Sequence, residues 1–249
     1  MLKAEREGGV LRLTLDRPEV RNAFDEALIA ALHEAFANVS ADVRAVVLSG
    51  SGEAFCAGGD LNWMRRAADQ TFEENEADAL RLARMLAAVR DCSALTVARI
   101  HGACFGGGCG LAAAVDVAIC ADDAKFSFSE VRLGLIPATI APFVLEKIGP
   151  GHARALFATA EVFDGAEAVR IGLARRSGPA DGLDEAIEKI LKGARANAPG
   201  AVSVAKRLAV APPATLEDAA RLLAERRATD EGREGIAAFL EKRKPEWAQ

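Results

Sequence analysis

The sequence predicts an α/β protein with a largely parallel sheet, followed by a C-terminal region built from helices. Two observations support this class. In the first half, apolar segments of strand length alternate with helical patterns, and beyond about residue 137 strand patterns nearly vanish. A chain of 249 residues can also bury a large core, as one domain or as one domain with an appendage.

The predicted elements of the first half follow from periodicity and end signals. Val10–Asp16 alternates apolar and polar residues, which is typical of a half-buried strand. Asp25 is a suitable N-cap for a helix that continues through Asn38. The remaining elements predicted here are strands at Val43–Leu48, Leu95–Ile100 and Val117–Ala121 and a helix at about Asn75–Arg90.

The second half is expected to be mainly helical. Residues 138–161 are expected to form two helices that are separated at Gly149–Gly151. A last short strand is predicted at Ala174–Ser177. From Asp181 to Lys244 the pattern indicates helices separated at Asn197–Gly200 and at Pro212-Pro213.

Composition excludes several classes of function. The 31 basic and 36 acidic residues give a net charge of −5, which provides no general attraction to nucleic acid or to an anionic membrane. No uncharged stretch reaches the roughly 18 residues of a membrane helix, and the N-terminus has no apolar signal segment. Five cysteines without a CxxC pair and three scattered histidines indicate a reduced, cytoplasmic protein without structural zinc.

Two glycine-rich segments are candidates for function. One is Gly102–Gly110, which with the preceding histidine has the sequence HGACFGGGCG. If a helix follows it, the free N–H groups at the start of that helix can stabilise a developing negative charge. Ala54–Asp60 directly follows a predicted strand and can present backbone N–H groups at the carboxyl end of the sheet. The alternatives are structural: Gly102–Gly110 would serve a close contact between a strand and a helix, and Ala54–Asp60 would be only a flexible loop.

A third candidate is Glu130, within Phe126–Pro137. Its neighbours are mostly apolar, so loss of solvent would raise the pKa of its carboxyl group towards use as a general base. The alternative for Glu130 is a salt bridge with Arg132 or an exposed turn.

A dinucleotide site is a weaker hypothesis. Gly108-x-Gly110-x-x-Ala113 matches a loose fingerprint, and Asp122-Asp123 ends the next strand. However, several residues separate the preceding predicted strand from Gly108, and the helix would be very short. Neither a phosphate-binding P-loop motif nor a G-x-S-x-G nucleophile motif is present, and Cys56 and Cys109 fit small apolar fillers.

The order of three motifs adds a resemblance to a known family. The segments AFCAGGDL, HGACFGGGCGLAAAVDVAICADDAKFSFSE and RLGLIP together resemble the enoyl-CoA hydratase/isomerase (crotonase) superfamily. The resemblance extends from LTLDRPEVRNAFD to EGIAAFLEKRKPEW, nearly the whole chain. It implies a spiral of ββα units, with a core domain over residues 1–195 that holds an acyl-CoA site. It also implies a helical region over residues 196–249 that forms a homotrimer or a dimer of trimers and contacts CoA.

The resemblance assigns catalytic roles by motif position. The backbone N–H groups of Gly59 and Gly107 would form an oxyanion hole around the thioester oxygen. Glu130 matches the second of two glutamates that flank a water molecule in the family's hydratases, whereas the first position is occupied by Gly110. Glu130 would therefore either activate water alone or move a proton between C4 and C2 in an isomerisation.

The resemblance also implies substrate contacts. Ala57 and Leu61 resemble adenine-side contacts, Phe239 and Lys242 resemble C-terminal CoA contacts often made to a neighbouring subunit, and Trp63 is expected to line the acyl pocket beside Met64. The other residues expected at the substrate are Gly58, Asp60, Gly106 and Gly110. No cofactor is expected, because coenzyme A is part of the substrate.

The motifs are most similar to a bacterial subgroup that resembles methylglutaconyl-CoA hydratases, which serve leucine and acyclic terpene breakdown. We therefore favour hydration over isomerisation. Gly110 is expected to leave space and to remove a charge beside a branched or carboxylated acyl group. A distal carboxylate would need a cation, for which Arg65, Arg66 and Arg132 are candidates. The alternatives are a nicotinamide-dependent oxidoreductase and a non-enzymatic, RNA-binding relative, against which the net charge of −5 argues.

Overall fold

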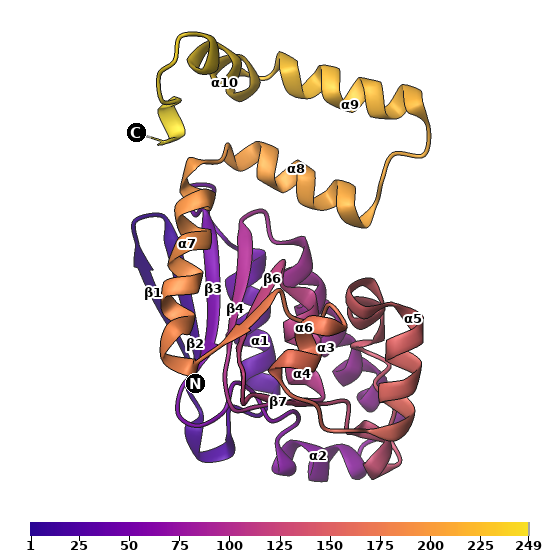
Figure 1. Ribbon diagram of the computed structural model, residues 1–249. Coiled ribbons are helices and arrows are strands. Elements are labelled where there is room, and N and C mark those ends of the chain that lie inside the picture. Colours follow the sequence, from indigo (N-terminus) through magenta and orange to yellow (C-terminus); the bar gives the residue numbers. More distant parts are fainter. Residues whose placement is uncertain (249) are drawn as a thin grey trace.

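A six-stranded sheet forms the centre of the computed structural model, which describes residues 1–248 (Figure 1). Its strand order is β1-β2-β3-β4-β6-β8. The first pair is antiparallel and every other pair is parallel. The strands are β1 (Leu2–Glu7), β2 (Val10–Leu15), β3 (Ala45–Gly50), β4 (Leu95–Ile100), β6 (Val117–Ala121) and β8 (Arg176–Gly178). The predicted α/β class with a largely parallel sheet is confirmed.

A second sheet is smaller and lies next to the glycine-rich segments. β5 (Ala103–Phe105) pairs in parallel with β7 (Lys125–Ser127), and each has three residues. Neither strand is predicted from the sequence. Because the two strands are parallel, the residues that follow Phe105 and Ser127 emerge at the same end of this sheet.

Helices cover both faces of the main sheet. The helix α7 packs on strands β3, β4 and β6, whereas α4 packs on β4 and β6 and also contacts α3, which packs against α1 (Figure 1). The helices of the first three quarters of the chain are α1 (Glu26–Ala37), α2 (Leu61–Ala68), α3 (Phe72–Asp91), α4 (Gly107–Ala114), α5 (Ala141–Thr159), α6 (Gly165–Arg170) and α7 (Leu183–Ala196). Short 3-10 turns occur at η1 (Pro18–Val20), η2 (Glu130–Leu133), η3 (Ala180–Gly182) and η4 (Glu246–Ala248).

Local chemistry explains where the helices begin and bend. The Asp25 carboxylate accepts a hydrogen bond from the Leu28 N–H at 2.8 Å, so the predicted N-cap of α1 is confirmed. Thr71 and Glu74 form a reciprocal capping box at the start of α3. α5 breaks at Gly149, whose φ of +69° is not helical, as the sequence predicts.

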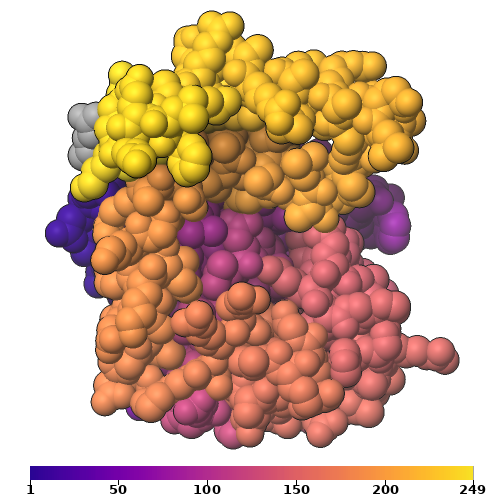
Figure 2. All heavy atoms as spheres, turned by 45° about the horizontal axis from the view of Figure 1, so that its top comes forward, coloured from indigo at the N-terminus to yellow at the C-terminus, as the bar shows by residue number. Residues whose placement is uncertain are grey.

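Three further helices, α8 (Pro199–Val210), α9 (Leu216–Ala228) and α10 (Asp230–Leu240), form one end of the molecule (Figures 1 and 2). Within them only Ala238 is buried, whereas Leu216 is 86% and Phe239 is 82% exposed. The helical C-terminal region is therefore confirmed as helical, and its apolar side chains have few partners within one chain. Gln249, the last residue of the predicted region, lies outside the described residues.

The helix α8 is attached to the sheet domain through a largely buried lysine. Lys206 Nζ lies 2.7 Å from the Asp116 carboxylate and donates hydrogen bonds to the carbonyl oxygens of Cys92 and Ala94 at 2.7 and 2.6 Å.

Between residues 1 and 248, no helix has both the length and the apolar character that crossing a membrane requires.

Candidate active site

Backbone pairing brings the two glycine-rich segments side by side. The first glycine loop (Ala54–Asp60) runs along β5: the Cys56 N–H donates to the Ala103 carbonyl at 3.0 Å, and the Phe105 N–H donates to the Cys56 carbonyl at 2.9 Å. These bonds extend the parallel pairing beyond the strands. As a result, Gly58 lies against Phe105, at the point where the second glycine segment (Gly102–Gly110) enters α4.

Phe24 connects the two segments and is a residue that the sequence analysis misses. Its N–H donates to the Gly58 carbonyl at 2.7 Å, and its carbonyl accepts from the Asp60 N–H at 2.8 Å. Its buried ring lies against Gly107, where an added Cβ would be only 2.6 Å from the ring atom Cε2. Residue 107 therefore needs to be glycine while Phe24 is present.

Two backbone N–H groups in this region are free. Gly107 is the first residue of α4, and an N–H at this position has no acceptor within the helix. The pairing with Phe24 uses the atoms on either side of Gly59 and leaves the Gly59 N–H unused. In the part of the chain that the structure describes, neither N–H donates to a backbone acceptor. Both can therefore donate to a ligand oxygen.

Glu130 reaches the same place from the second sheet. The Gly106 N–H donates to the Ser127 carbonyl at 2.9 Å, which fixes the end of β7, and Glu130 opens η2 three residues later. A Cβ built on Gly106 would lie 3.3 Å from Glu130 Oε1 and 4.0 Å from the Gly58 Cα. The φ of Gly106 is +50°, so a side chain there would be both strained and in the way of the carboxylate.

The environment of Glu130 favours proton transfer. Burial raises the pKa of its carboxyl group, and Oε2 is buried without a hydrogen-bond partner among residues 1–248. The Arg132 guanidinium donates to the Ala160 carbonyl at 2.7 Å, and no ion pair with Glu130 is formed. The salt-bridge alternative for Glu130 is thus wrong. A carboxyl group whose pKa is raised holds a proton more readily, so Glu130 can accept and return a proton during a reaction.

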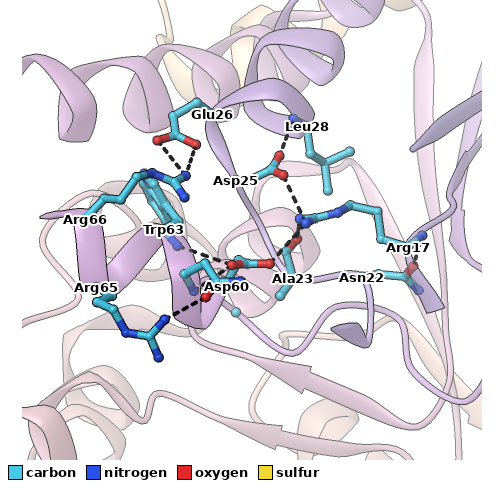
Figure 3. A network of polar contacts seen from close by, with 12 residues as sticks. Arg17, Asn22, Ala23, Asp25, Glu26, Leu28, Asp60, Trp63, Arg65 and Arg66 are labelled. Atoms are coloured by element: carbon cyan, nitrogen blue, oxygen red, sulfur yellow. Dashed lines mark hydrogen bonds and ion pairs between the residues drawn. The ribbon is translucent and has the colours of Figure 1, made fainter. Parts of the chain in front are cut away.

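A polar network fixes the end of the first glycine loop (Figure 3). The Arg17 guanidinium lies 3.0 Å from both the Asp60 and the Asp25 carboxylates and donates to the Ala23 carbonyl at 2.6 Å. Asp60 in turn accepts from the N–H groups at the start of α2, including that of Trp63 at 3.2 Å. Burial of Asp60 raises its pKa, but those N–H donors and Arg17 outweigh it, so the pKa is lowered.

Of the two predicted contacts on α2, Trp63 lies against the first glycine loop, whereas Leu61 is exposed. A Cβ on Gly59 would lie 3.4 Å from the Trp63 ring atoms Cε3 and Cζ3, so the indole covers Gly59. Leu61, at the start of α2, is 75% exposed. Ala57 lies within the first glycine loop, where its N–H donates to the Arg21 carbonyl at 3.0 Å.

The expectation that Gly110 leaves open space is wrong. A Cβ at residue 110 would be 2.5 Å from Ile140 Cγ2 and 3.4 Å from Leu86 Cδ1. Ile140 therefore occupies the room that a side chain at this position would take. Gly110 allows α4 and the start of α5 to pack closely.

Other predicted residues are outside this cluster. Phe239 lies in α10 and Lys242 follows this helix, at the opposite end of the molecule from α2 (Figure 1), so one chain does not bring them to Glu130. Burial raises the pKa of the Cys56 thiol to about 12, which fits a filler and not a nucleophile. One argument against the dinucleotide hypothesis is also wrong, because β5 ends just before α4.

Comparisons with known proteins agree with this geometry. The sequence profile of the enoyl-CoA hydratase/isomerase family matches residues 5–249. The chain belongs to this family. AtuE of Pseudomonas aeruginosa is 42% identical, with a TM-score of 0.95 over 100% of this chain and 99% of its own. An enoyl-CoA hydratase from Shewanella pealeana is 36% identical, with a TM-score of 0.93 over 99% of this chain and 95% of its own.

The family also includes isomerases. A peroxisomal Δ3,5-Δ2,4-dienoyl-CoA isomerase of Arabidopsis thaliana is 29% identical over 100% of this chain and 96% of its own. The chain is therefore an enzyme of a family whose members have been named for both reactions on enoyl-CoA thioesters. The predicted superfamily and its fold are confirmed.

Proposed function

We propose that this enzyme is an enoyl-CoA hydratase in which Glu130 is the only catalytic carboxylate. The thioester oxygen would accept hydrogen bonds from the Gly59 and Gly107 N–H groups. Glu130 would take a proton from water as the water oxygen adds to C3 of the α,β-unsaturated acyl group, and the electron pair of the double bond would form an enolate. Glu130 would then return this proton to C2, so no cofactor is needed.

One observation carries the proposal. Glu130 lies beside Gly58 and Gly106, its Oε2 is buried without a hydrogen-bond partner among residues 1–248, and the N–H groups of the next residues, Gly59 and Gly107, are free. Charge develops on the thioester oxygen only as the enolate forms. Fixed N–H donors therefore stabilise the transition state more than the bound substrate, and one such donor typically contributes about 3 kcal/mol.

The alternative is an enoyl-CoA isomerase in which Glu130 moves a proton from C4 to C2. It is favoured by the glycine at position 110, which leaves a single carboxylate, and by the isomerase among the relatives. The two reactions differ in whether water is added. Product identification with 3-enoyl-CoA and crotonyl-CoA therefore distinguishes them.

For the acyl group, we propose 3-methylglutaconyl-CoA or a related branched or carboxylated enoyl-CoA, which would place the reaction in leucine breakdown. Arg66 is paired with both Glu26 oxygens, at 2.7 and 2.9 Å, and is not free for a substrate carboxylate. Arg65 and Arg132, each bonded to a neutral acceptor, remain as candidates. The packing of Gly110 supplies no argument for this substrate.

The test combines a substrate screen with a matched pair of variants. The protein is assayed with crotonyl-, 3-methylglutaconyl- and 3-enoyl-CoA, with the products identified. Glu130→Gln should lower kcat by at least about 100-fold while CoA binding is kept. The control is Glu161→Gln, an exposed glutamate outside the cluster, which should leave kcat unchanged. Near-normal turnover by Glu130→Gln would contradict the proposal.

We also propose a homotrimer or a dimer of trimers, working in a reducing cytoplasm. Leu216, Phe239 and Leu240 are 86, 82 and 72% exposed in one chain, and an oligomer would cover apolar side chains of this kind. In such an assembly Phe239 and Lys242 would contact the CoA of a neighbouring subunit. Light scattering at micromolar concentration checks this, and a monomer would exclude it.

A further inference from the structure

The helix α2 is held by polar contacts and buries none of its residues. Its N-terminus is capped by Asp60, and Arg66 near its end pairs with Glu26. Trp63 is partly buried against the hydrophobic core, but no residue of the helix is fully buried, so packing adds less stability than in a buried helix. The direction of the Trp63 ring on this helix therefore depends on the individual contacts that the ring makes.

One of these contacts is a hydrogen bond to a buried carboxylate of α3. The Trp63 indole Nε1 donates to Asp78 Oδ2 at 2.6 Å, and Asp78 is only 3% exposed. The other oxygen of Asp78 forms an ion pair with the Arg81 guanidinium at 2.5 Å, which fixes the direction of the carboxylate. A hydrogen bond to a charged acceptor is stronger than one between neutral groups. The other end of the indole covers Gly59.

We infer that Asp78 is a positioning residue that fixes the Trp63 indole over Gly59 and thereby sets the width of the acyl site on that side. This inference rests on the proposed function, because it takes the Gly59 N–H as a donor to the thioester oxygen. Atoms of the acyl group next to the carbonyl must then lie near the indole. A fixed ring admits a narrow chain and excludes a wide one, whereas a loose ring admits both.

The sequence allows a direct readout of the ring. The chain has two tryptophans and no tyrosine, so in a Trp247→Phe protein Trp63 is the only strong fluorophore. Trp247 lies in η4 and donates to the Ala196 carbonyl, on an element that does not belong to the site. Emission and acrylamide quenching in this background report on Trp63 alone, without a substrate.

The variants separate positioning from simple attachment of α2. Asp78→Ala removes the acceptor of Trp63, and Asp78→Asn keeps an oxygen in its place. Glu26→Ala removes a different attachment of α2, and Arg81→Ala removes only the second partner of Asp78. Thermal melts show whether each variant is folded.

Selectivity is measured by binding of saturated thioesters, which cannot be hydrated. Butyryl-CoA is the narrow ligand and 3-phenylpropanoyl-CoA is the wide one, and quenching of Trp63 gives their dissociation constants. Asp78→Ala should increase the exposure of Trp63 to acrylamide and lower the preference for butyryl-CoA about tenfold. Asp78→Asn and Glu26→Ala should keep both values near those of the parent, whereas Arg81→Ala, which leaves the Asp78 carboxylate free to turn, should shift both values in the direction of Asp78→Ala.

Three results would overturn the inference: unchanged quenching in folded Asp78→Ala, an unchanged ratio of dissociation constants despite changed quenching, or an equal loss of preference in Glu26→Ala. The last result would mean that any loosening of α2 has the same effect. A parent protein that binds butyryl-CoA but does not act on any enoyl-CoA would refute the proposed function alone, and the ratio of dissociation constants would still decide the role of Asp78.

Discussion

Gly110 and Ile140 form a contact whose energy can be tested by a double-mutant cycle. Ile140 is buried, and its Cγ2 would be 2.5 Å from a Cβ at residue 110, about 1 Å closer than a normal carbon contact. Gly110→Ala therefore forces α4 and the start of α5 apart. Such overpacking costs about 1–3 kcal/mol, and the better helix propensity of alanine offsets about 1 kcal/mol of this.

The partner substitution should relieve this strain. Ile140→Ala alone should cost about 2–5 kcal/mol, because it leaves a cavity in a buried site. In the double variant the new methyl group enters that cavity. We expect the double variant to lose about 1–2 kcal/mol less free energy of unfolding than the sum of the losses in the two single variants.

The assay is urea unfolding of the four proteins, with the slope of the free energy against urea checked for equality. Gly193→Ala is the matched control, because Gly193 lies in α7 and an added Cβ there has nothing within 4 Å. It should stabilise the protein by about 1 kcal/mol and be additive with Ile140→Ala. Additivity of Gly110→Ala with Ile140→Ala within about 0.5 kcal/mol would refute the contact.

Four further predictions concern the parts of the site. Because burial raises the pKa of Glu130, the acid limb of kcat/KM should lie above the ordinary glutamate value of 4.5 and be absent in Glu130→Gln; an acid limb in that variant would contradict the assignment. Because the pKa of Glu130 is higher in the folded than in the unfolded protein, the protonated group stabilises the fold at pH values below the unfolded pKa. This stabilisation is lost as the pH rises through the folded pKa. Glu130→Gln should therefore have a higher melting temperature than the parent at neutral pH, but not near pH 4. Arg17→Leu should cost about 3 kcal/mol by urea unfolding, because it leaves the buried Asp60 without its cation; a loss below about 0.5 kcal/mol would show that the network is dispensable. Phe24→Ala should lower the free energy of unfolding by about 3–5 kcal/mol and should also lower kcat. A folded variant with unchanged kcat would refute the role of Phe24 in joining the glycine segments.

Continuous apolar patterns made much of the fold predictable. The limits of Leu95–Ile100 and Val117–Ala121 are confirmed residue by residue, because both strands are buried in the sheet. β1 was missed because this exposed edge strand carries charged residues that do not alternate with apolar ones. β5 and β7 were missed because each has only three residues, in glycine-rich or phenylalanine-rich surroundings where periodicity is not measurable.

The site was predictable only as far as its motifs extend. The motifs pointed to Glu130 and the two glycine segments, which the structure brings together. They gave no indication of Phe24, whose role depends on pairing with Gly58 and Asp60 far along the chain. The packing of Gly110 against Ile140 was likewise hidden, because the direction of an absent Cβ is a property of the fold and not of the local sequence.

The way Phe24 joins the glycine segments also determines when the site forms during folding. Phe24, Gly59, Gly107 and Glu130 come from four separate segments, and the contacts among them are all non-local. Non-local contacts require the closure of long loops and form slowly. A nascent chain whose synthesis has not passed Glu130 therefore lacks the site altogether. Binding of an acyl-CoA should appear late in refolding, after helical signals have returned, and so report the completion of the sheet.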